Sequence, residues 1–196
     1  MNDEVKKFPR KFTEIQEATK KLDFDQISDP LLGSLLSTLV ATKPNGKFLE
    51  LGTGSGLSTA WMLQGMDKGS TLITIDNEKE LVSIAKKYLG DDERISFIVG
   101  AGEDLILETE KASIDFIFAD TWPGKYNHLE ETLSLLKYGG IYLIDDMLPQ
   151  DNWPEEHDKK ANNLIHYLEN RNDFLLTKMS WSTGIIICTK TEAYPT

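Results

Sequence analysis

Aspartates end several of the apolar runs in this chain, and two of these runs are close in the predicted sheet. Asp120 closes the run IDFIFAD at residues 114–120, and Asp145 with Asp146 closes IYLIDD at residues 141–146. In open α/β sheets, ligands bind beyond the carboxyl ends of the strands, so carboxylates at these positions lie where chemistry takes place. Asp120 is followed by a break at TWPG, and three roles are open for it: binding a metal, holding a cofactor, or closing the strand.

A glycine-rich loop follows another apolar run and reads ELGTGSG from Glu50 to Gly56. Its glycines have G-x-G-x-G spacing, whereas the dinucleotide fingerprint has G-x-G-x-x-G and places a pyrophosphate at a helix N-terminus. Glu50 would repel a pyrophosphate but would attract an ammonium or sulfonium group. The loop therefore favours S-adenosylmethionine over NAD as the cofactor, although a tight strand-to-helix turn needs glycines as well.

Two further strand ends carry residues that suit a nucleoside. Asp76 ends the run TLITID, and its carboxylate can accept both ribose hydroxyls, with capping of the next helix as the structural alternative. The segment 99–104, VGAGED, has small residues that leave room for an adenine ring, and Glu103 could meet the exocyclic amine. Helix capping by Glu103 and Asp104 is the competing interpretation.

The hydrophobic pattern alternates short apolar runs with amphipathic stretches, which predicts a doubly wound α/β fold with a mostly parallel sheet. The pattern changes after residue 146. A polar helix is followed by two β-rich runs with a short turn between them, which predicts an antiparallel hairpin at 174–190. Five strands are predicted at 47–51, 71–76, 95–100, 114–120 and 141–146. The helices between and after them are predicted at 57–66, 78–89, 102–110, 127–137 and 155–170.

Length and composition limit the class of protein. The chain has 196 residues and a net charge of −11, which suits a single domain (1–196) and disfavours nucleic acid and anionic membranes as partners. A single cysteine excludes an internal disulfide, and no apolar run approaches the roughly 20 residues that span a bilayer. We expect a cytoplasmic protein that acts on a small molecule, with a peripheral helical segment at 1–26 that could contribute to a homodimer.

With these motifs in place, the chain resembles the class I S-adenosylmethionine-dependent methyltransferases, and more narrowly the catechol O-methyltransferase group and its small bacterial relatives. The resemblance covers about residues 28–190 and rests on ELGTGSGLST, VGAGEDLI, FADTWPGKY and YLIDDML. It implies a Rossmann-like methyltransferase fold with a seven-stranded sheet and an antiparallel last strand, which agrees with the predicted hairpin.

The resemblance also implies roles for particular residues. It assigns cofactor binding to Glu50, Gly52, Thr53, Gly54, Ser58, Asp76, Asn77, Ala101, Gly102, Glu103, Asp120 and Trp122. It assigns the binding of Mg²⁺ or another divalent cation to Asp120, Asp145 and Asp146. A chelated acceptor hydroxyl would lose its proton more easily beside such a cation.

Two positions depart from the catechol pattern. The third metal position is Asp146 rather than an amide, which adds a negative charge to the site. This charge favours two alternatives: the site binds Ca²⁺ or Mn²⁺ in place of Mg²⁺, or the Asp146 side chain points away from the metal. Pro123 stands where the catechol enzymes have a lysine base, and proline cannot accept a proton. Lys125 is the nearest replacement, with a solvated surface lysine as the alternative. His157, in NWPEEHDKK beside Trp153, either covers an acceptor pocket or is solvated.

These observations predict an O-methyltransferase that uses S-adenosylmethionine on a small hydroxylated acceptor, with Asp120 and Lys125 as catalytic residues and a metal as a further aid. A metal-independent methyltransferase on another small acceptor is the first alternative, and a cofactor-binding module without catalysis is the second. A nicotinamide dehydrogenase is the weakest of the alternatives.

Overall fold

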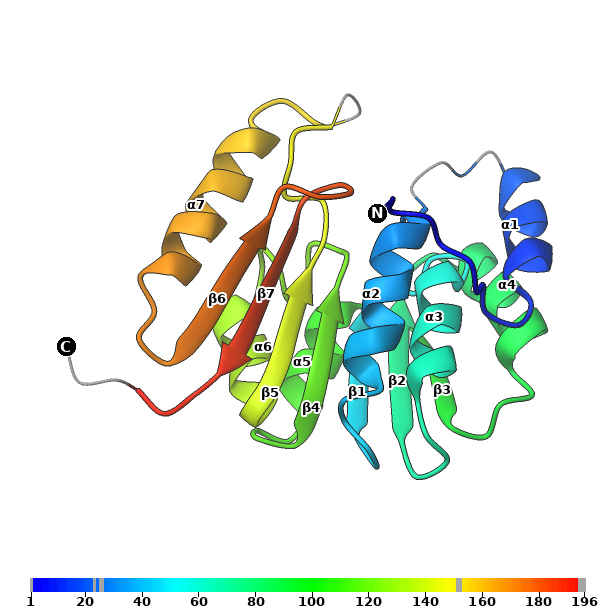
Figure 1. Ribbon diagram of the computed structural model, residues 1–196, viewed down its shortest axis with the longest axis horizontal. Coiled ribbons are helices and arrows are strands. Elements are labelled where there is room, and N and C mark those ends of the chain that lie inside the picture. The colour runs from blue at the N-terminus through cyan, green and yellow to red at the C-terminus, as the bar shows by residue number, and fades with distance from the viewer. Residues whose placement is uncertain (1, 23, 25–26, 151–152, 194–196) are drawn as a thin grey trace. The chain divides into compact units, whose positions relative to one another are not determined.

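The computed structural model describes residues 2–22, 24, 27–150 and 153–193, and the chain divides into two compact units, Met1–Gly102 and Glu103–Thr196 (Figure 1). Part of the predicted N-terminal helical segment, residues 1, 23, 25 and 26, lies outside the described residues. Whether the chain acts as one domain stays a prediction.

The first unit is a parallel three-stranded region with helices between its strands. Its elements are α1 (Phe12–Lys20), α2 (Pro30–Val40), β1 (Lys47–Leu51), α3 (Leu57–Gly65), β2 (Thr71–Asp76), α4 (Lys79–Leu89) and β3 (Ile95–Val99). Helix α2 begins as its sequence indicates, because Asp29 accepts a hydrogen bond from the backbone N–H of Leu31 at 2.7 Å and Pro30 occupies the first turn.

Strand β2 pairs in parallel with β1 on one side and with β3 on the other. The register places Leu51 opposite Ile75 and Asp76 opposite Val99, so the three carboxyl ends are level. Helices α2 and α3 pack against each other and lie on the face of these strands that Figure 1 turns toward the viewer. The loops that leave the three strands therefore emerge at one edge of this region.

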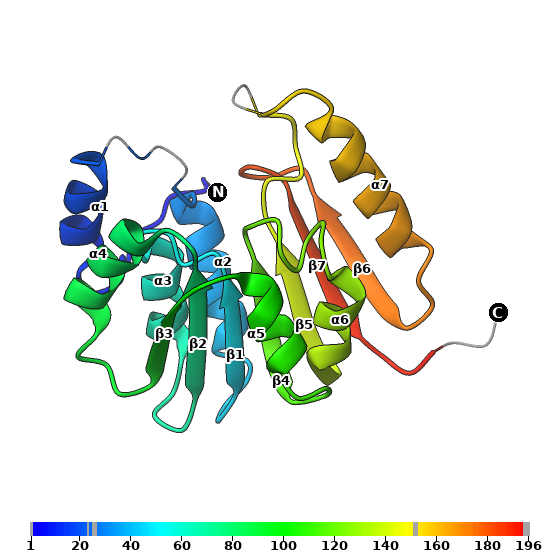
Figure 2. The same cartoon turned by 180° about the vertical axis from the view of Figure 1, so that it is seen from behind.

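The second unit contains two parallel strands and the predicted hairpin. Its elements are α5, which begins at the boundary (Gly102–Glu108), β4 (Ile114–Ala119), α6 (Leu129–Leu135), β5 (Leu136–Ile144), α7 (His157–Glu169), β6 (Phe174–Met179) and β7 (Ile185–Lys190). Strand β5 is parallel to β4 and antiparallel to β7, and β7 is also antiparallel to β6. Helices α5 and α6 lie on the face of β4 and β5 that is turned forward in Figure 2.

The strand order is β3-β2-β1-β4-β5-β7-β6, with β7 antiparallel to its neighbours. This confirms the predicted doubly wound, mostly parallel seven-stranded sheet with an antiparallel last strand. The apolar runs predicted as strands are those that the structure buries, because nearly every residue of β1, β4 and β5 that is apolar is inaccessible to solvent.

One predicted helix is too long. The prediction extended it over 127–137, but α6 ends at Leu135 because Leu136 takes an extended backbone conformation and pairs with Ile114 of β4. Strand β5 consequently begins five residues before the predicted position, and the pairing with β4 shifts register between Ile114 and Phe116. The segment from Lys137 to Gly140, which includes two glycines, separates Leu136 from the apolar run, so the sequence pattern did not indicate this start.

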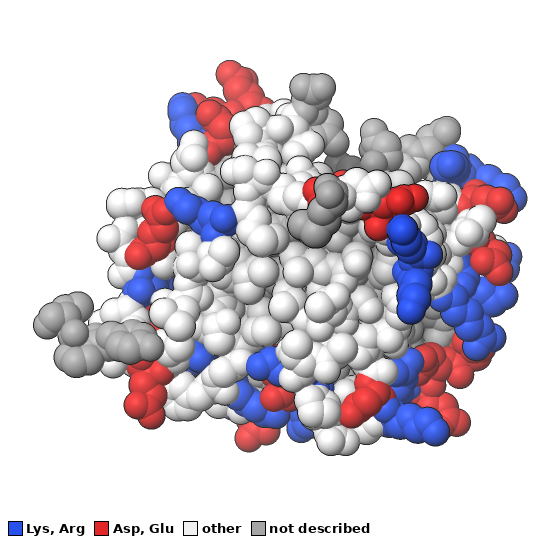
Figure 3. Space-filling view, viewed as in Figure 1, with Lys and Arg blue, Asp and Glu red and all other residues white. Residues whose placement is uncertain are grey.

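The described surface carries charges of both signs. Figure 3 shows Lys and Arg beside Asp and Glu around α1 and α4, and mostly uncharged surface over α2 and α3. Within the described residues, every helix is too short or too polar to cross a lipid bilayer.

Candidate active site

The glycine-rich loop after β1 adopts a backbone that only glycine takes readily. Gly52, Gly54 and Gly56 have φ angles of 102°, 50° and 95°, all in the left-handed region. The loop is anchored to β2, because the N–H of Gly52 donates to the carbonyl of Ile75 at 2.9 Å and that of Gly54 donates to the Asp76 carboxylate at 2.8 Å. The loop is therefore fixed before any ligand arrives.

The glycines of this loop serve two purposes. A Cβ at Gly56 would stand 2.7 Å from the Cβ of Ala85, so this glycine allows the loop and α4 to pack closely. Among the described residues, a Cβ at Gly54 would have Phe24 as its near neighbour, at 4.0 Å, so the described part of the chain leaves room on this side of the loop. The third glycine, which breaks the dinucleotide spacing, is thus explained by packing and not by phosphate binding.

Glu50 is completely buried beneath the loop, and three hydroxyl groups donate to its carboxylate. Ser58 reaches Oε1 at 2.6 Å, and Thr59 and Thr74 reach Oε2 at 2.5 and 2.6 Å. Thr74 also shares a 2.6 Å hydrogen bond with Thr53. Burial raises the pKa of Glu50 to about 7, although the three hydroxyls oppose this rise. Of the two hydroxyls that the resemblance assigned to the cofactor, that of Ser58 donates to Glu50 and that of Thr53 is hydrogen-bonded to Thr74.

The remaining predicted cofactor residues of the first unit lie at the ends of β2 and β3. Asp76 accepts hydrogen bonds from the N–H groups of Gly54 and of Glu78, the latter at 2.9 Å. The N–H of Gly100 donates to the carbonyl of Asp76 at 3.0 Å, which ties the start of the predicted adenine segment to β2. Asn77 and Ala101 are exposed, Gly102 is buried and Glu103 is half-buried in the first turn of α5.

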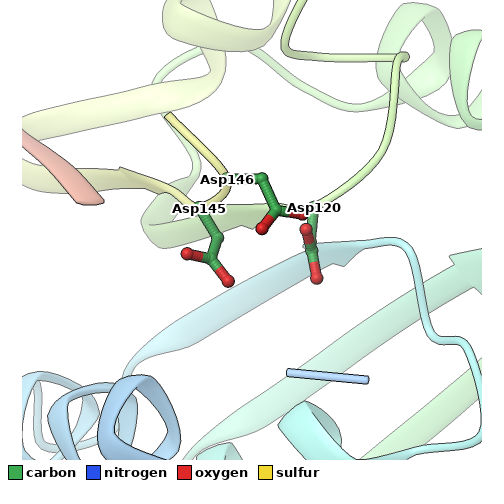
Figure 4. Close-up of side chains that lie close together, drawn as sticks. All are labelled: Asp120, Asp145 and Asp146. Atoms are coloured by element: carbon green, nitrogen blue, oxygen red, sulfur yellow. The ribbon is translucent and has the colours of Figure 1, made fainter. Parts of the chain in front are cut away.

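The second unit brings the three aspartates together. Ala119 of β4 is opposite Ile144 of β5, so Asp120 and Asp145 follow at neighbouring strand ends, and Asp146 comes next in the chain. One carboxylate oxygen from each of the three lies within 4.8 Å of the others. Figure 4 shows Asp120 and Asp146 directed toward each other, with Asp145 beside them. Three convergent carboxylates are a donor set that suits a hard divalent cation such as Mg²⁺ or Ca²⁺.

Two neighbouring side chains hold Asp145 in place. Thr183 donates from its hydroxyl to the carboxylate, and the amine of Lys125 donates to the backbone carbonyl at 2.6 Å. Burial and the charge of Asp146 raise the pKa of Asp145 to about 6. Burial also raises the pKa of Asp146, while Lys125 opposes that rise. The positive charge of Lys125 therefore offsets part of the negative charge of Asp145 and Asp146.

The turn after β4 places Trp122 and Lys125. The carbonyl of Trp122 accepts hydrogen bonds from the N–H groups of Lys125 and Tyr126, at 3.2 and 2.8 Å, and the hydroxyl of Tyr142 donates to the carbonyl of Gly124 at 2.6 Å. Lys125 is 4% exposed, so the alternative of a solvated surface lysine is wrong. Trp122 is 42% exposed, and its ring lies against those of Tyr126 and His157.

Two residues near the acidic cluster had weak or absent sequence signals. Thr183 is in the turn between β6 and β7, 38 positions from Asp145, and nothing in its local sequence indicates the contact. His157 is 7% exposed and shares a 3.1 Å hydrogen bond with the Tyr126 hydroxyl, so its solvated alternative is wrong. Its place beside Trp153 in NWPEEH was the sequence signal that singled it out, whereas the contact with Tyr126 had none.

The strand order, with β7 antiparallel to its neighbours, defines the Rossmann-like methyltransferase fold. Solved structures agree. A Corynebacterium glutamicum protein superposes with a TM-score of 0.84 at 19% identity, over 98% of this chain and 94% of that one. The O-methyltransferase TomG from Streptomyces achromogenes, in complex with SAM, gives 0.82 at 21% identity, over 94% and 91%. A Bacillus cereus O-methyltransferase in complex with SAH gives 0.82 at 18% identity, over 96% and 94%.

Sequence comparison is more specific. The family model described as O-methyltransferase matches residues 5–190, and the chain belongs to that family. A putative O-methyltransferase from Mycobacterium avium is 31% identical over 120 residues, which are 59% of this chain and 54% of that protein. The chain thus spans about half the length of the curated relatives that it matches.

Proposed function

We propose that this protein is an S-adenosylmethionine-dependent O-methyltransferase that acts on a small hydroxylated acceptor. The observation that carries the proposal is the edge of the first unit, where a fixed glycine loop with an open Gly54 adjoins the Asp76 carboxylate. Family membership and the cofactor named for TomG and the Bacillus cereus enzyme support the same choice.

In this proposal the residues of the first unit bind the cofactor. Asp76 keeps lone pairs for two ribose hydroxyls after accepting one N–H bond on each carboxylate oxygen. The exposed Asn77 and Ala101 bound the space for adenine, with Gly102 and Glu103 beyond them. Glu50 has no exposed atom for direct contact with the cofactor, so its role is to hold the hydroxyls of Ser58, Thr59 and Thr74 beneath the loop. The adenine role of Trp122 and the cofactor role of Asp120 stay predictions.

We also propose that Asp120, Asp145 and Asp146 hold a divalent cation, because their carboxylates converge within 4.8 Å. Such a cation would lower the pKa of an acceptor hydroxyl bound to it. Thr183 and Lys125 keep Asp145 oriented toward the cluster. The catalytic roles of Asp120 and Lys125 stay predictions. The hydrogen bond from the Lys125 amine to the backbone carbonyl of Asp145 supports a role for this lysine in positioning Asp145.

A metal-independent reaction is the second candidate. Lys125 supplies a buried positive charge that opposes the rise in the pKa of Asp145 and Asp146 and so partly compensates the acidic cluster. In that case the aspartates would orient the acceptor by hydrogen bonds alone. Methyl transfer measured with Mg²⁺ and then with excess chelator separates the two candidates: activity that survives chelation excludes the metal-assisted one.

The cofactor proposal is tested by calorimetric titration of S-adenosylhomocysteine. Asp76→Asn loses the charge-assisted bonds to ribose and should weaken binding about 10- to 100-fold, since such bonds contribute about 1.5–3 kcal/mol. Asp91→Asn makes the same change of charge at an exposed surface ion pair and should leave the affinity unchanged. Equal affinities for the two variants, or tight binding of NADH instead, would contradict the proposal.

A further inference from the structure

A cavity opens at the amino ends of β2 and β3, within the first unit, and we call it the amino-end cavity. Its volume is about 620 Å³, which lies within the roughly 300–1,000 Å³ that small-molecule sites occupy. Residues of α3, of the end of α4, of the segment before α1 and of the turns that lead into β2 and β3 line it. The glycine loop and Asp76 follow the carboxyl ends of β1 and β2, so the cavity is separate from the candidate cofactor site.

The floor of the amino-end cavity is apolar. Leu63 of α3 and Leu89 of α4 line it and are 7% and 6% exposed, so each shows only a small apolar area to the cavity. Tyr88, half-buried at the end of α4, adds the face of an aromatic ring. An apolar group placed against these side chains would be removed from water. The floor therefore favours a ligand with an apolar body.

Arg94 makes one wall of the amino-end cavity rigid. Its Nε and Nη2 donate to the two carboxylate oxygens of Asp92, at 2.9 and 2.6 Å. Nη1 also donates to the carbonyl of Met66 at 2.6 Å, and Nη2 to that of Leu63 at 3.1 Å. These bonds tie the turn before β3 to the end of α3 and occupy the guanidinium. The wall is therefore formed before a ligand arrives, and Arg94 and Asp92 are already neutralised by each other.

Other charged side chains of the cavity are also paired. Arg10 lies 3.4 Å from the carboxylate of Asp91, and the amine of Lys11 lies 3.0 Å from that of Glu14. Figure 3 shows this mixture of signs around α1 and α4. The pairs leave little net charge to attract a simple anion or cation.

Two charges of opposite sign stay available in the amino-end cavity. Lys68, in the turn before β2, and Glu93, in the turn before β3, are exposed, and neither has a hydrogen bond or ion pair within the described part of the chain. The two turns are neighbours, because the N–H of Leu72 donates to the carbonyl of Arg94 at 2.8 Å. Lys68 and Glu93 do not pair with each other, so a ligand that satisfies both must carry two separated charges.

We propose that the amino-end cavity binds a short apolar peptide with free termini. The carboxylate of the peptide pairs with Lys68, its ammonium group pairs with Glu93, and its side chains lie against Leu63 and Leu89. An extended dipeptide spans up to about 7 Å, whereas an amino acid carries both charges on one carbon atom. This site lies outside the methyl-transfer site of the proposed function and does not depend on it.

The test is a titration of the isotopically labelled protein with leucyl-leucine, followed through the chemical shifts of its backbone amides. The shifts should change at Lys68 and Glu93. N-acetyl-leucyl-leucine lacks the positive charge and leucyl-leucinamide lacks the negative one, so each should bind about two- to fivefold more weakly, as expected for the loss of one exposed ion pair. Glycyl-glycine keeps both charges without the apolar body and should bind more than tenfold more weakly.

Two variants assign the charges. Lys68→Gln should weaken leucyl-leucine about two- to fivefold and leave leucyl-leucinamide unaffected, because the amide has no carboxylate to lose. Glu93→Gln should weaken leucyl-leucine to the same extent and leave N-acetyl-leucyl-leucine unaffected. Lys111→Gln removes an exposed lysine of the second unit and is the matched control, with no change expected for any probe.

Three outcomes would overturn the inference. One is an absence of shift changes at Lys68 and Glu93 up to the solubility limit of leucyl-leucine. Another is an equal loss for all probes in Lys68→Gln, which would mean that the lysine does not meet the carboxylate. The third is a shift change at Gly54 and Asp76 in place of the cavity residues, which would put the peptide at the candidate cofactor site. A separate titration with S-adenosylhomocysteine tests the proposed function, which stands if the cofactor binds and the peptide does not.

Discussion

Replacing Glu50 with glutamine should change how stability depends on pH. The carboxylate is fully buried, and its pKa is raised from 4.5 to about 7. Below pH 4.5 the group is protonated in the folded and the unfolded chain, and it imposes no electrostatic penalty. As the pH rises from 4.5 toward 7, the unfolded chain releases the proton and the folded chain retains it, so stability falls. Above pH 7 the full penalty is present.

The size of this penalty follows from the shift in pKa. One pKa unit corresponds to about 1.4 kcal/mol, so the buried carboxylate costs roughly 3 kcal/mol above pH 7. Glutamine has the same shape and does not titrate. Its carbonyl can accept the hydrogen bonds of Thr59 and Thr74, and its amide can donate to Ser58 if that hydroxyl reverses. Glu50→Gln should therefore gain stability relative to wild type as the pH increases.

Urea denaturation at several pH values between 5 and 8 measures the effect. The difference in unfolding free energy between Glu50→Gln and wild type should grow by about 2–3 kcal/mol over this range. Glu93→Gln, at an exposed position, is the control and should show a nearly constant difference. A constant difference for Glu50→Gln as well would refute the reasoning, because it would mean that the carboxylate ionises with the same pKa in both states.

Three other substitutions address the loop and the acidic cluster. Gly56→Ala should destabilise the fold by about 2–4 kcal/mol, because it adds a steric overlap to the strain of positive φ. Gly139→Ala has positive φ but open space around it and should cost about 1 kcal/mol. Thermal denaturation measures the loss of stability in each variant. Lys125→Met removes the donor to a buried carbonyl and should cost about 1–3 kcal/mol in the same assay, with no loss expected if that bond is unimportant. Asp146→Asn removes one ligand charge and should weaken Mg²⁺ binding about tenfold by calorimetry, and unchanged affinity would place the ion elsewhere.

Much of the fold could be predicted because apolar runs and glycine turns are local signals. The runs 47–51 and 71–76 coincide with β1 and β2, since strands covered on both faces are rich in apolar residues. The start of β5 could not be predicted in this way, because Leu136 is separated from the apolar part of the strand by Lys137 to Gly140.

The site was predicted less completely, because its chemistry depends on distant contacts. The three aspartates could be singled out by their places after apolar runs, but the register of Ala119 with Ile144 is what brings them together. The burial of Lys125 depends on the carbonyl of Asp145, twenty positions away, and the orientation of Asp145 depends on Thr183. No pattern of neighbouring residues carries such information.

The backbone at Asp146 limits how this site can vary. Its φ angle is 54°, a left-handed conformation that aspartate, asparagine and glycine tolerate and that longer or branched side chains adopt at a cost. A glutamate would gain reach but would strain the chain, so exchange at this position is restricted in practice to an acid, an amide or no side chain. Mutation can therefore adjust the charge of the cluster by one unit while the position of the ligand oxygen stays nearly the same. In the proposed cation site, such an exchange would change the preference among cations without rebuilding the strand end.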